Sequence, residues 1–453
     1  MILTTAAALA IALMLFTWLG LRARLAGGDL DDYITARNSQ GAQALGLSFL
    51  ASGMGSWILF APPEVGATVG PLALAGYAVG AALPFIVLGW FGPAIRRYLP
   101  AGRSIGEFAQ ACYGQGMRRW VALISILYMM CFLIAELTAI GSITSLLSGL
   151  NGAYAVVGVA VATLVYTAWG GLRASLVTDR WQAFLLIALL VVVGAVALQR
   201  LPTMAEAVPL PAVPLDSALA VALTLVIAVT AANLFHQGYW QRVWSARSDQ
   251  ALGQGAMLGG ITTVVVVAVV GLLGIAAATS GLALGTPPIP FFAMLEGAPA
   301  WLSLAALVLA LTLVASSVDT LQNALASLAV TEKQGLSLSA ARWFTVILMV
   351  PVIAIALQGY SVLRLFLIAD LLCATAVIPI FMGLWSRMTT PAAVAGALAG
   401  LVGAVAPGWV AQGSLPAGLQ AASFPGGIPT LAPFAWALVA SALVSVVVAL
   451  AGG

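Results

Sequence analysis

The hydrophobic residues of this chain fall into long blocks separated by short polar stretches. Most blocks run for about twenty residues, the length that a helix needs to cross the roughly 30 Å hydrocarbon core of a bilayer. A backbone exposed to lipid must satisfy its own hydrogen bonds, so these blocks are predicted to be helices. We count thirteen candidate spans: 1–21, 45–68, 71–95, 118–149, 153–170, 180–199, 217–239, 254–281, 299–330, 340–358, 362–386, 390–407 and 432–450. The pattern predicts an all-α membrane protein with about thirteen transmembrane helices.

The composition supports a membrane protein with no extramembrane domain. Of 453 residues, 62% are hydrophobic and 7% are charged, whereas a soluble domain has about 25% charged residues. The net charge of +3 gives no sign of a nucleic-acid partner, and Cys112, Cys131 and Cys373 are too scattered for a disulfide framework or a metal site. Only 408–431 has the composition of a long loop. The function is therefore expected within or across the bilayer.

The basic residues predict how the chain is oriented. If the N-terminus is outside, fifteen arginines and lysines fall in cytoplasmic loops, and only Arg200 and Arg364 fall on the other side. Positive charge is normally retained on the cytoplasmic side of a membrane. The expected topology has the N-terminus outside and the C-terminus inside.

The second span contains residues that interrupt a helix. Gly53 and Gly55 weaken it, and the pair Pro62-Pro63 removes two backbone donors. Carbonyls freed at that depth are tolerated where they line a cavity or hold an ion. The alternative is a kinked helix packed through small residues, which the adjacent Glu64 makes less comfortable.

The seventh span ends in polar residues where an apolar helix should continue. His236, the single histidine, is either an interfacial residue or part of a second discontinuous helix that faces the second span. The nearby aromatic residues equally fit a belt at the membrane surface. The residues concerned are Asn233, His236, Gln237, Gly238, Tyr239, Trp240 and Trp244.

The ninth span has a polar stripe at helical spacing. Ser and Thr are common in helix packing, but a central Asp319 costs about 2.5–3.5 kcal/mol on insertion scales and usually faces a cavity, a partner or an ion. Hydroxyl oxygens along such a stripe suit a small hard cation. The stripe consists of Thr312, Ser316, Asp319, Thr320, Asn323 and Ser327, with Ser317 beside it.

Three other acids lie in or near spans. Glu136 and Asp370 are each either a relay group or half of a structural pair. Asp179 follows a Gly-Gly turn and begins a helix, where it is either an N-terminal stabiliser through the helix dipole or a functional acid.

These features together resemble the sodium/solute symporter family, which includes sodium symporters of proline, sialic acid, sugars and urea. The most specific match is YTAWGGLRASLVTDRWQ from Tyr166. The others are DLDDYITARNSQG after the first span, YWQRVWSAR from Tyr239, and Ser316-Ser317 followed by Asp319-Thr320. The likeness covers about residues 30–390.

The resemblance implies a leucine-transporter (LeuT) type fold with a five-plus-five inverted repeat. One helix precedes this core and two follow it, and the second and seventh spans become the paired broken helices. The implied division is 1–44 for the first helix and loop, 45–200 and 201–386 for the two repeats, and 387–453 for the last two helices.

The resemblance also implies the residues of each site. The sodium ion would bind backbone carbonyls of Ala51, Met54 and Leu313 and the hydroxyls of Ser316 and Ser317, with Asp179 and Asp319 on the ion path or around the site. The solute would lie near Ser56, Trp57, Phe60, Glu64, Asn233, His236, Gln237 and Trp240. Gly53 stands where the proline branch has an acid, and the Ser56-Trp57 pair looks nearer to the urea branch.

The expected function is sodium-coupled symport of a small polar organic solute by alternating access. Its partners are the solute and the lipid bilayer, with no obligate protein partner, and the expected location is the inner membrane of a prokaryote. Proton coupling through Glu64, Asp319 or Glu136 is one alternative, and a solute sensor without net transport is another. No nucleophile–base motif suggests an enzyme.

Overall fold

The computed structural model of the protein describes residues 2–22, 34–199, 208–285, 288–332, 337–360, 362–425 and 429–452. Within these ranges the regular structure is helical, apart from one isolated bridge between Gln40 and Ala246. Nine of the described helices are long and apolar enough to cross a membrane, or eleven when two bent helix pairs are each counted as a span. The prediction of an all-α membrane protein is confirmed.

The helices follow the predicted order, and the predicted breaks are present. Span 45–68 consists of two helices that are bent by 69° at their junction, and span 217–239 is interrupted before its end. Span 362–386 also bends by 45°, which was not predicted. The main helices are α1 (Ile2–Arg22), α3 (Ala42–Gly53), α4 (Trp57–Thr68), α5 (Pro71–Tyr98), α7 (Gln115–Ser148), α8 (Gly152–Gln199), α9 (Leu215–Asn233), α10 (Gln237–Ser245), α11 (Asp249–Thr279), α13 (Ala300–Glu332), α14 (Leu338–Ala356), α15 (Val362–Ala374), α16 (Val377–Phe381), α17 (Thr390–Gln412) and α19 (Leu431–Ala451). Shorter helices are α6 (Ile105–Tyr113), α12 (Pro290–Ala293), α18 (Leu415–Ala422) and the 3-10 turn η2 (Met382–Leu384).

Helix α8 contains two of the predicted spans and reverses direction at Gly171. The φ of 58° and ψ of −151° at Gly171 belong to a region that is essentially restricted to glycine. Tyr166 before the turn and Thr178 after it donate hydrogen bonds to the same carboxylate oxygen of Asp319, at 2.6 and 3.1 Å. In a straight helix these two residues would lie about 18 Å apart along the axis. Counting both arms of α8 and the shorter α14 as spans restores the predicted thirteen.

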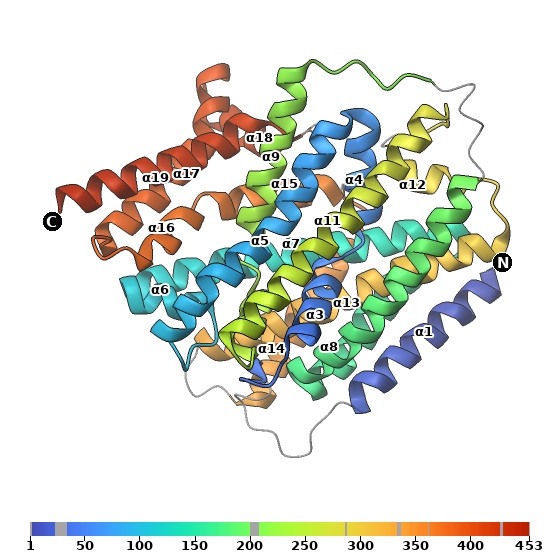
Figure 1. Cartoon of the computed structure of the whole chain (residues 1–453), viewed down its shortest axis with the longest axis horizontal. Coiled ribbons are helices and arrows are strands. Elements are labelled where there is room, and N and C mark those ends of the chain that lie inside the picture. Colours follow the sequence, from blue (N-terminus) through green and yellow to red (C-terminus); the bar gives the residue numbers. More distant parts are fainter. Residues whose placement is uncertain are drawn as a thin grey trace.

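The most buried spans lie in the middle of the bundle. In the apolar stretches of α7 and α13, 72% of the residues are buried, against 17% in α1 and 28% in α19. Figure 1 accordingly shows α1 and α19 at opposite edges, with α7 and α13 between them. Most residues in the apolar stretches of α7 and α13 are thus shielded from lipid.

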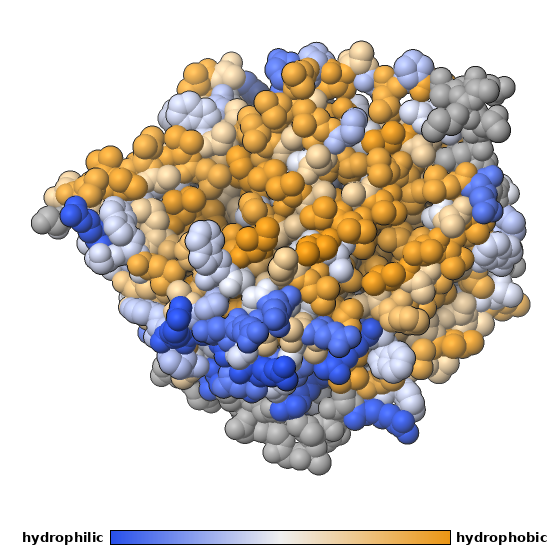
Figure 2. Space-filling view, viewed as in Figure 1, coloured by the Kyte–Doolittle hydropathy of each residue, from blue (hydrophilic) through white to orange (hydrophobic). Residues whose placement is uncertain are grey.

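The surface divides into an apolar band and a hydrophilic end. Figure 2 shows hydrophobic residues over most of the visible face, and hydrophilic ones gathered where α3 begins and α5 ends. Arg96 binds Asn38 at 2.9 Å and pairs with Asp249 at 3.7 Å, and Arg37 donates to the Pro100 carbonyl at 2.8 Å. We call this region the arginine-rich end, and in the predicted orientation it is cytoplasmic.

The reversal at Gly171 gives a test of the fold. A Gly171→Ala substitution forces an L-residue into a backbone region that costs about 1–3 kcal/mol, so thermal unfolding of the purified protein should shift to lower temperature. The matched control is Gly253→Ala in α11, where an added Cβ meets no atom within 4 Å. Equal melting temperatures for the two variants would contradict the reversal.

Candidate functional site

The first break, between α3 and α4, is filled by a carboxylate from another helix. The Ser56 backbone N–H donates to Glu136 Oε2 of α7 at 2.7 Å, and the Trp57 indole N–H donates to the Gly53 carbonyl at 3.1 Å. A Cβ on Gly55 would overlap the Glu136 carboxylate, so a larger residue here would displace Glu136 from this position. Glu136 therefore caps the start of α4, where a negative charge is favoured by the helix dipole.

The second break, between α9 and α10, is lined by aromatic rings. The His236 ring stacks on Tyr239 with centroids 4.5 Å apart and meets the rings of Tyr128 and Phe132 edge-on, each at 6.1 Å. The Trp240 indole N–H donates to the freed carbonyl of Leu234 at 2.8 Å. Backbone opened in the membrane interior is thus satisfied partly by side chains, as the hydrocarbon environment requires.

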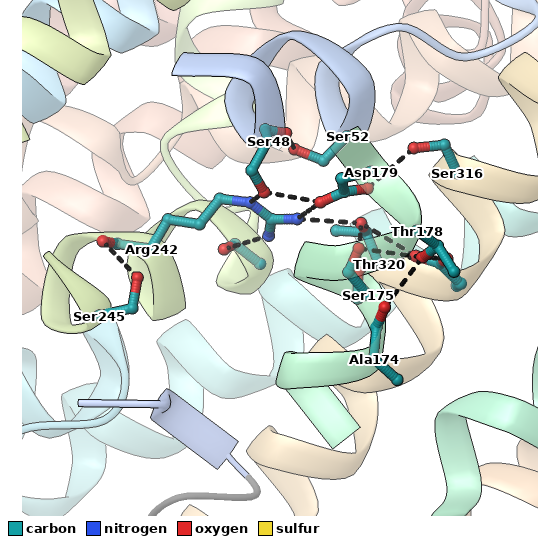
Figure 3. Close-up of polar contacts among 12 residues, drawn as sticks. Ser48, Ser52, Ala174, Ser175, Thr178, Asp179, Arg242, Ser245, Ser316 and Thr320 are labelled. Carbon is teal, nitrogen blue, oxygen red and sulfur yellow. Dashed lines mark hydrogen bonds and ion pairs between the residues drawn. The ribbon is translucent and has the colours of Figure 1, made fainter. Parts of the chain in front are cut away.

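Asp179, Arg242 and three hydroxyls form a buried cluster that joins four helices (Figure 3). The Arg242 guanidinium donates to Asp179 Oδ2 at 2.8 Å and to the Ser48 hydroxyl at 2.7 Å, and both charged side chains are fully buried. Ser48 of α3 and Ser316 of α13 each donate to Asp179, at 2.6 and 3.0 Å. Thr320 accepts from Arg242 at 3.2 Å. Asp179 is therefore a charged junction between α3, α8, α10 and α13.

Asp319 lies in a neighbouring network of hydroxyl groups, which Thr320 connects to the Asp179 cluster. It accepts hydrogen bonds from Tyr166, Ser175 and Thr178, at distances of 2.6 to 3.1 Å, and from its neighbour Thr320 at 3.3 Å. A buried carboxylate with several hydroxyl donors needs no counter-ion in contact. Its network joins both arms of α8 to α13.

The five sodium candidates are all buried, and α3 packs against α13. Ser316 is held by Asp179, whereas the Ser317 hydroxyl has no hydrogen-bond partner. Ala51 lies one turn beyond Ser48 on α3, and Ser48 shares the Asp179 carboxylate with Ser316. The structure thus brings α3 and the hydroxyl-bearing turn of α13 to a common junction.

Three of the eight solute candidates line one cavity. Trp57, Phe60 and Glu64 lie on one face of α4, in the wall of a cavity of about 490 Å³. Other walls come from α7, α15 and loops at the end opposite the arginine-rich end. They include Thr138, Ser142, Leu363, Phe366, Pro288 and Tyr360.

The remaining solute candidates lie at the breaks or between the breaks and the arginine-rich end. Ser56 is beside Glu136, and Asn233 accepts from Tyr128 at 3.3 Å. Gln237 donates to the Arg103 carbonyl at 2.5 Å, towards the arginine-rich end. Trp240 is fully buried and packs on Phe381 and Trp244. Gln237 and Trp240 therefore have structural partners outside the cavity.

Some of the unpartnered buried polar atoms lie at the two breaks. Such atoms are rare in folded proteins and costly without a ligand, ion or water. In the part of the chain that the structure describes, those at the two breaks are Ser56 Oγ, Glu136 Oε1, both ring nitrogens of His236 and Gln237 Oε1, and Ser317 Oγ on α13 is another. These atoms make the two breaks candidate ligand sites.

Several residues of the site were not among the sequence candidates. Glu136 was expected only as a relay or a structural pair, and Arg242, Ser48 and Tyr128 were not singled out. The four-residue spacing of Tyr128, Phe132 and Glu136 on α7 is the signal that could have found the wall facing both breaks. No local pattern indicates that Arg242 reaches Asp179.

Comparison with known proteins gives the family. Residues 33–400 match the sodium:solute symporter family, whose members are membrane transporters and not enzymes. The acidic stretch at 29–33, part of the predicted family element, lies outside the described residues. A curated relative, the spermidine transporter DUR31 of Candida albicans (strain SC5314 / ATCC MYA-2876), is 28% identical over 361 residues, covering 78% of this chain and 69% of the relative.

Solved structures give the fold. A Na+-coupled sialic acid symporter in a substrate-bound outward-open state aligns with a TM-score of 0.77 over 99% of this chain and 98% of that one, at 14% identity. Mhp1, a nucleobase-cation-symport-1 family transporter, aligns with a TM-score of 0.60 over 94% and 95%, at 14% identity. The predicted LeuT-type fold is confirmed. With its broken helices and its match over most of the sequence, this chain belongs to the sodium:solute symporter family.

Proposed function

We propose that the protein is a sodium-coupled symporter that carries a small, amine-bearing organic solute into the cell by alternating access. The observation that carries the sodium assignment is the buried, unpartnered hydroxyl of Ser317 on α13, which packs against the broken helix α3. Carbonyl and hydroxyl oxygens are the ligands that suit a small hard cation.

Sodium supplies both the shape change and the driving force in this proposal. An ion held by Ala51 and Met54 on α3 and by Leu313, Ser316 and Ser317 on α13 ties the two helices together. Its charge moving inward gains about 2.3 kcal/mol per 100 mV of membrane potential. That energy drives solute uptake against a gradient.

The Arg242–Asp179 pair acts as the inner gate. Backbone bonds beside it hold the start of α3 to the end of α10: the Gln40 N–H donates to the Ser245 carbonyl at 2.8 Å, and the Arg247 N–H donates to the Gln40 carbonyl at 2.9 Å. Separating α3 from α10 would break these bonds and free Ser48 from Arg242. The cavity at the opposite end together with this closed inner end corresponds to an outward-facing state.

The solute class rests on the cavity and on the fungal relative. Glu64 gives the cavity a carboxylate beside aromatic rings, which favours a cation over an anion. The relative described as a spermidine transporter supports an amine-bearing solute. The likeness to the urea branch, the two-repeat division of the chain and its orientation in the membrane stay predictions. The location in a prokaryotic inner membrane also stays a prediction, since the curated relative is fungal.

Proton coupling is the second candidate because Glu136 Oε1 has no partner. In that case the carboxyl would carry the driving ion itself. Uptake driven by an inward proton gradient in sodium-free buffer would favour this alternative.

The proposed sodium site predicts that removal of the Ser317 hydroxyl weakens the sodium dependence of uptake. In proteoliposomes, Ser317→Ala should raise the sodium concentration for half-maximal uptake about tenfold or more, as expected for a lost ion ligand. Ser441→Ala is the matched control, since this hydroxyl in α19 is also buried and unpartnered. Wild-type uptake that persists when choline replaces sodium at fixed pH would reject the assignment.

The Arg242–Asp179 ion pair predicts that single and double substitutions lower the melting temperature by different amounts. Asp179→Asn leaves a buried guanidinium without its counter-ion, a change that costs about 3–5 kcal/mol in buried pairs. The double variant Asp179→Asn/Arg242→Gln should melt at a higher temperature than Asp179→Asn alone. A double variant that melts at a lower temperature than Asp179→Asn alone would show that Arg242 and Asp179 do not stabilise the fold as a pair.

A further inference from the structure

We propose that the cavity of about 490 Å³ beside α4 is a binding site for an organic ammonium ion, with Glu64 as its counter-charge. The inference rests on the proposed function, since the ligand is the charged amine of the solute. It adds a site that lies outside the two helix breaks and that binds without sodium. In the predicted orientation the cavity is at the outer end, so a solute entering from outside meets it before the breaks.

The face of α4 that carries Glu64 is fixed by packing on another side of the helix. Trp57, Phe60 and Glu64 are three and four residues apart, share one face and line the cavity. Pro63 lies against α11, where a Cβ on Gly274 would overlap the Pro63 backbone. Turning Glu64 away from the cavity would therefore disrupt the close contact between α4 and α11.

The carboxylate of Glu64 is available to a ligand. It is half-buried, and it is the one charged group among the described residues that line the cavity. Within the described part of the chain it has no ion pair and accepts no side-chain hydrogen bond. Arg364 of α15 lies between two lining residues, but it donates to the carbonyl and the hydroxyl of Ser423, at 2.9 and 3.2 Å. An unpaired carboxylate in a membrane helix is costly, and a bound cation reduces that cost.

Aromatic rings form part of the cavity wall and are held in place from behind. Three of the lining rings each pack against a second ring that does not line the cavity. These pairs, with the distances between ring centroids, are Trp57–Tyr77 (5.5 Å), Phe60–Phe292 (5.2 Å) and Phe366–Phe132 (4.9 Å). Aromatic rings attract ammonium groups, and a wall that is already ordered costs little further entropy when a ligand binds.

The size and polarity of the cavity suit an ammonium group on an alkyl chain. Its volume lies in the range of about 300–1,000 Å³ that is typical of small-molecule sites. Thr138 and Ser142 of α7 also line it, and they donate their own protons to backbone carbonyls at 3.3 and 3.0 Å. Their oxygens therefore remain as acceptors. One carboxylate and two hydroxyl oxygens spread over apolar walls are too few and too dispersed for a hard metal ion, which needs about six oxygens at one point.

The test measures equilibrium binding of radiolabelled spermidine to the purified full-length protein in potassium chloride without sodium. Potassium replaces sodium because choline is itself an organic ammonium ion. Glu64→Gln removes the charge at nearly constant size and should raise the Kd about fivefold to tenfold, since solvent screens part of the interaction. Glu64→Asp keeps the charge and should raise the Kd less. Asp216→Asn removes an exposed acid at the start of α9 and is the matched control, with the wild-type Kd.

A second pair of variants tests the aromatic wall. Tyr360, a further lining residue, has an exposed side chain at the end of the loop before α15. Tyr360→Ala should raise the Kd about twofold to fivefold, whereas Tyr360→Phe keeps the ring and should bind as the wild type does. Unlabelled putrescine, which carries ammonium groups, should displace the spermidine. Urea, which is neutral, should not.

Wild-type affinity in folded Glu64→Gln would overturn the proposal, as would displacement of spermidine by urea or a wild-type protein that binds no spermidine in potassium. Gel filtration monitors folding. If Glu64→Gln does not fold, equal binding by Tyr360→Ala and Tyr360→Phe would overturn it instead. Uptake into proteoliposomes tests the proposed function separately. Spermidine uptake that needs no sodium, together with binding that Glu64→Gln weakens, would reject the sodium coupling and leave the ammonium site in place.

Discussion

The opened backbone between α3 and α4 is the constraint on which the rest of the structure depends. Inside a bilayer, freed carbonyls and N–H groups must find partners within the protein. Here Glu136 binds the start of α4 from one side, and α13 packs on α3 from the other. The absence of water makes the break costly. It also makes the break suitable for a cation, because the freed carbonyl oxygens are already dehydrated and available as ligands.

The charges divide into two groups with different roles. Towards the arginine-rich end, Asp179 is neutralised by Arg242, so that cluster holds helices together. At the break itself, Glu136 has no ion pair among the described residues and instead accepts from the Ser56 N–H. A transported cation can supply a positive charge beside Glu136, whereas the positive charge of Arg242 closes the opposite side of the break.

The fold was largely predictable from the sequence because the length of each apolar block predicts a span, and because glycines mark the first break and polar residues the second. The pair Pro62-Pro63 does not interrupt α4. Gly53, Gly55 and the polar end of the seventh span predicted where the helices are interrupted. The site was predictable only in part. The Ser316-Ser317 pair stood out by its motif, whereas Glu136 meets Ser56 across 80 residues and Arg242 meets Asp179 across 63. Contacts at such separations depend on how the bundle packs, which no local pattern records. The fold of α8 at Gly171 likewise needed coordinates, since a Gly-Gly pair alone does not give the direction of the second arm.

The most direct measurement is an experimental structure in saturating sodium at a resolution that shows bound ions. The account predicts density for one ion between α3 and α13, in contact with the Ser317 hydroxyl and the carbonyls of Ala51 and Met54. An ion found elsewhere, or a Ser317 hydroxyl bonded to another protein group in the sodium-bound state, would contradict it.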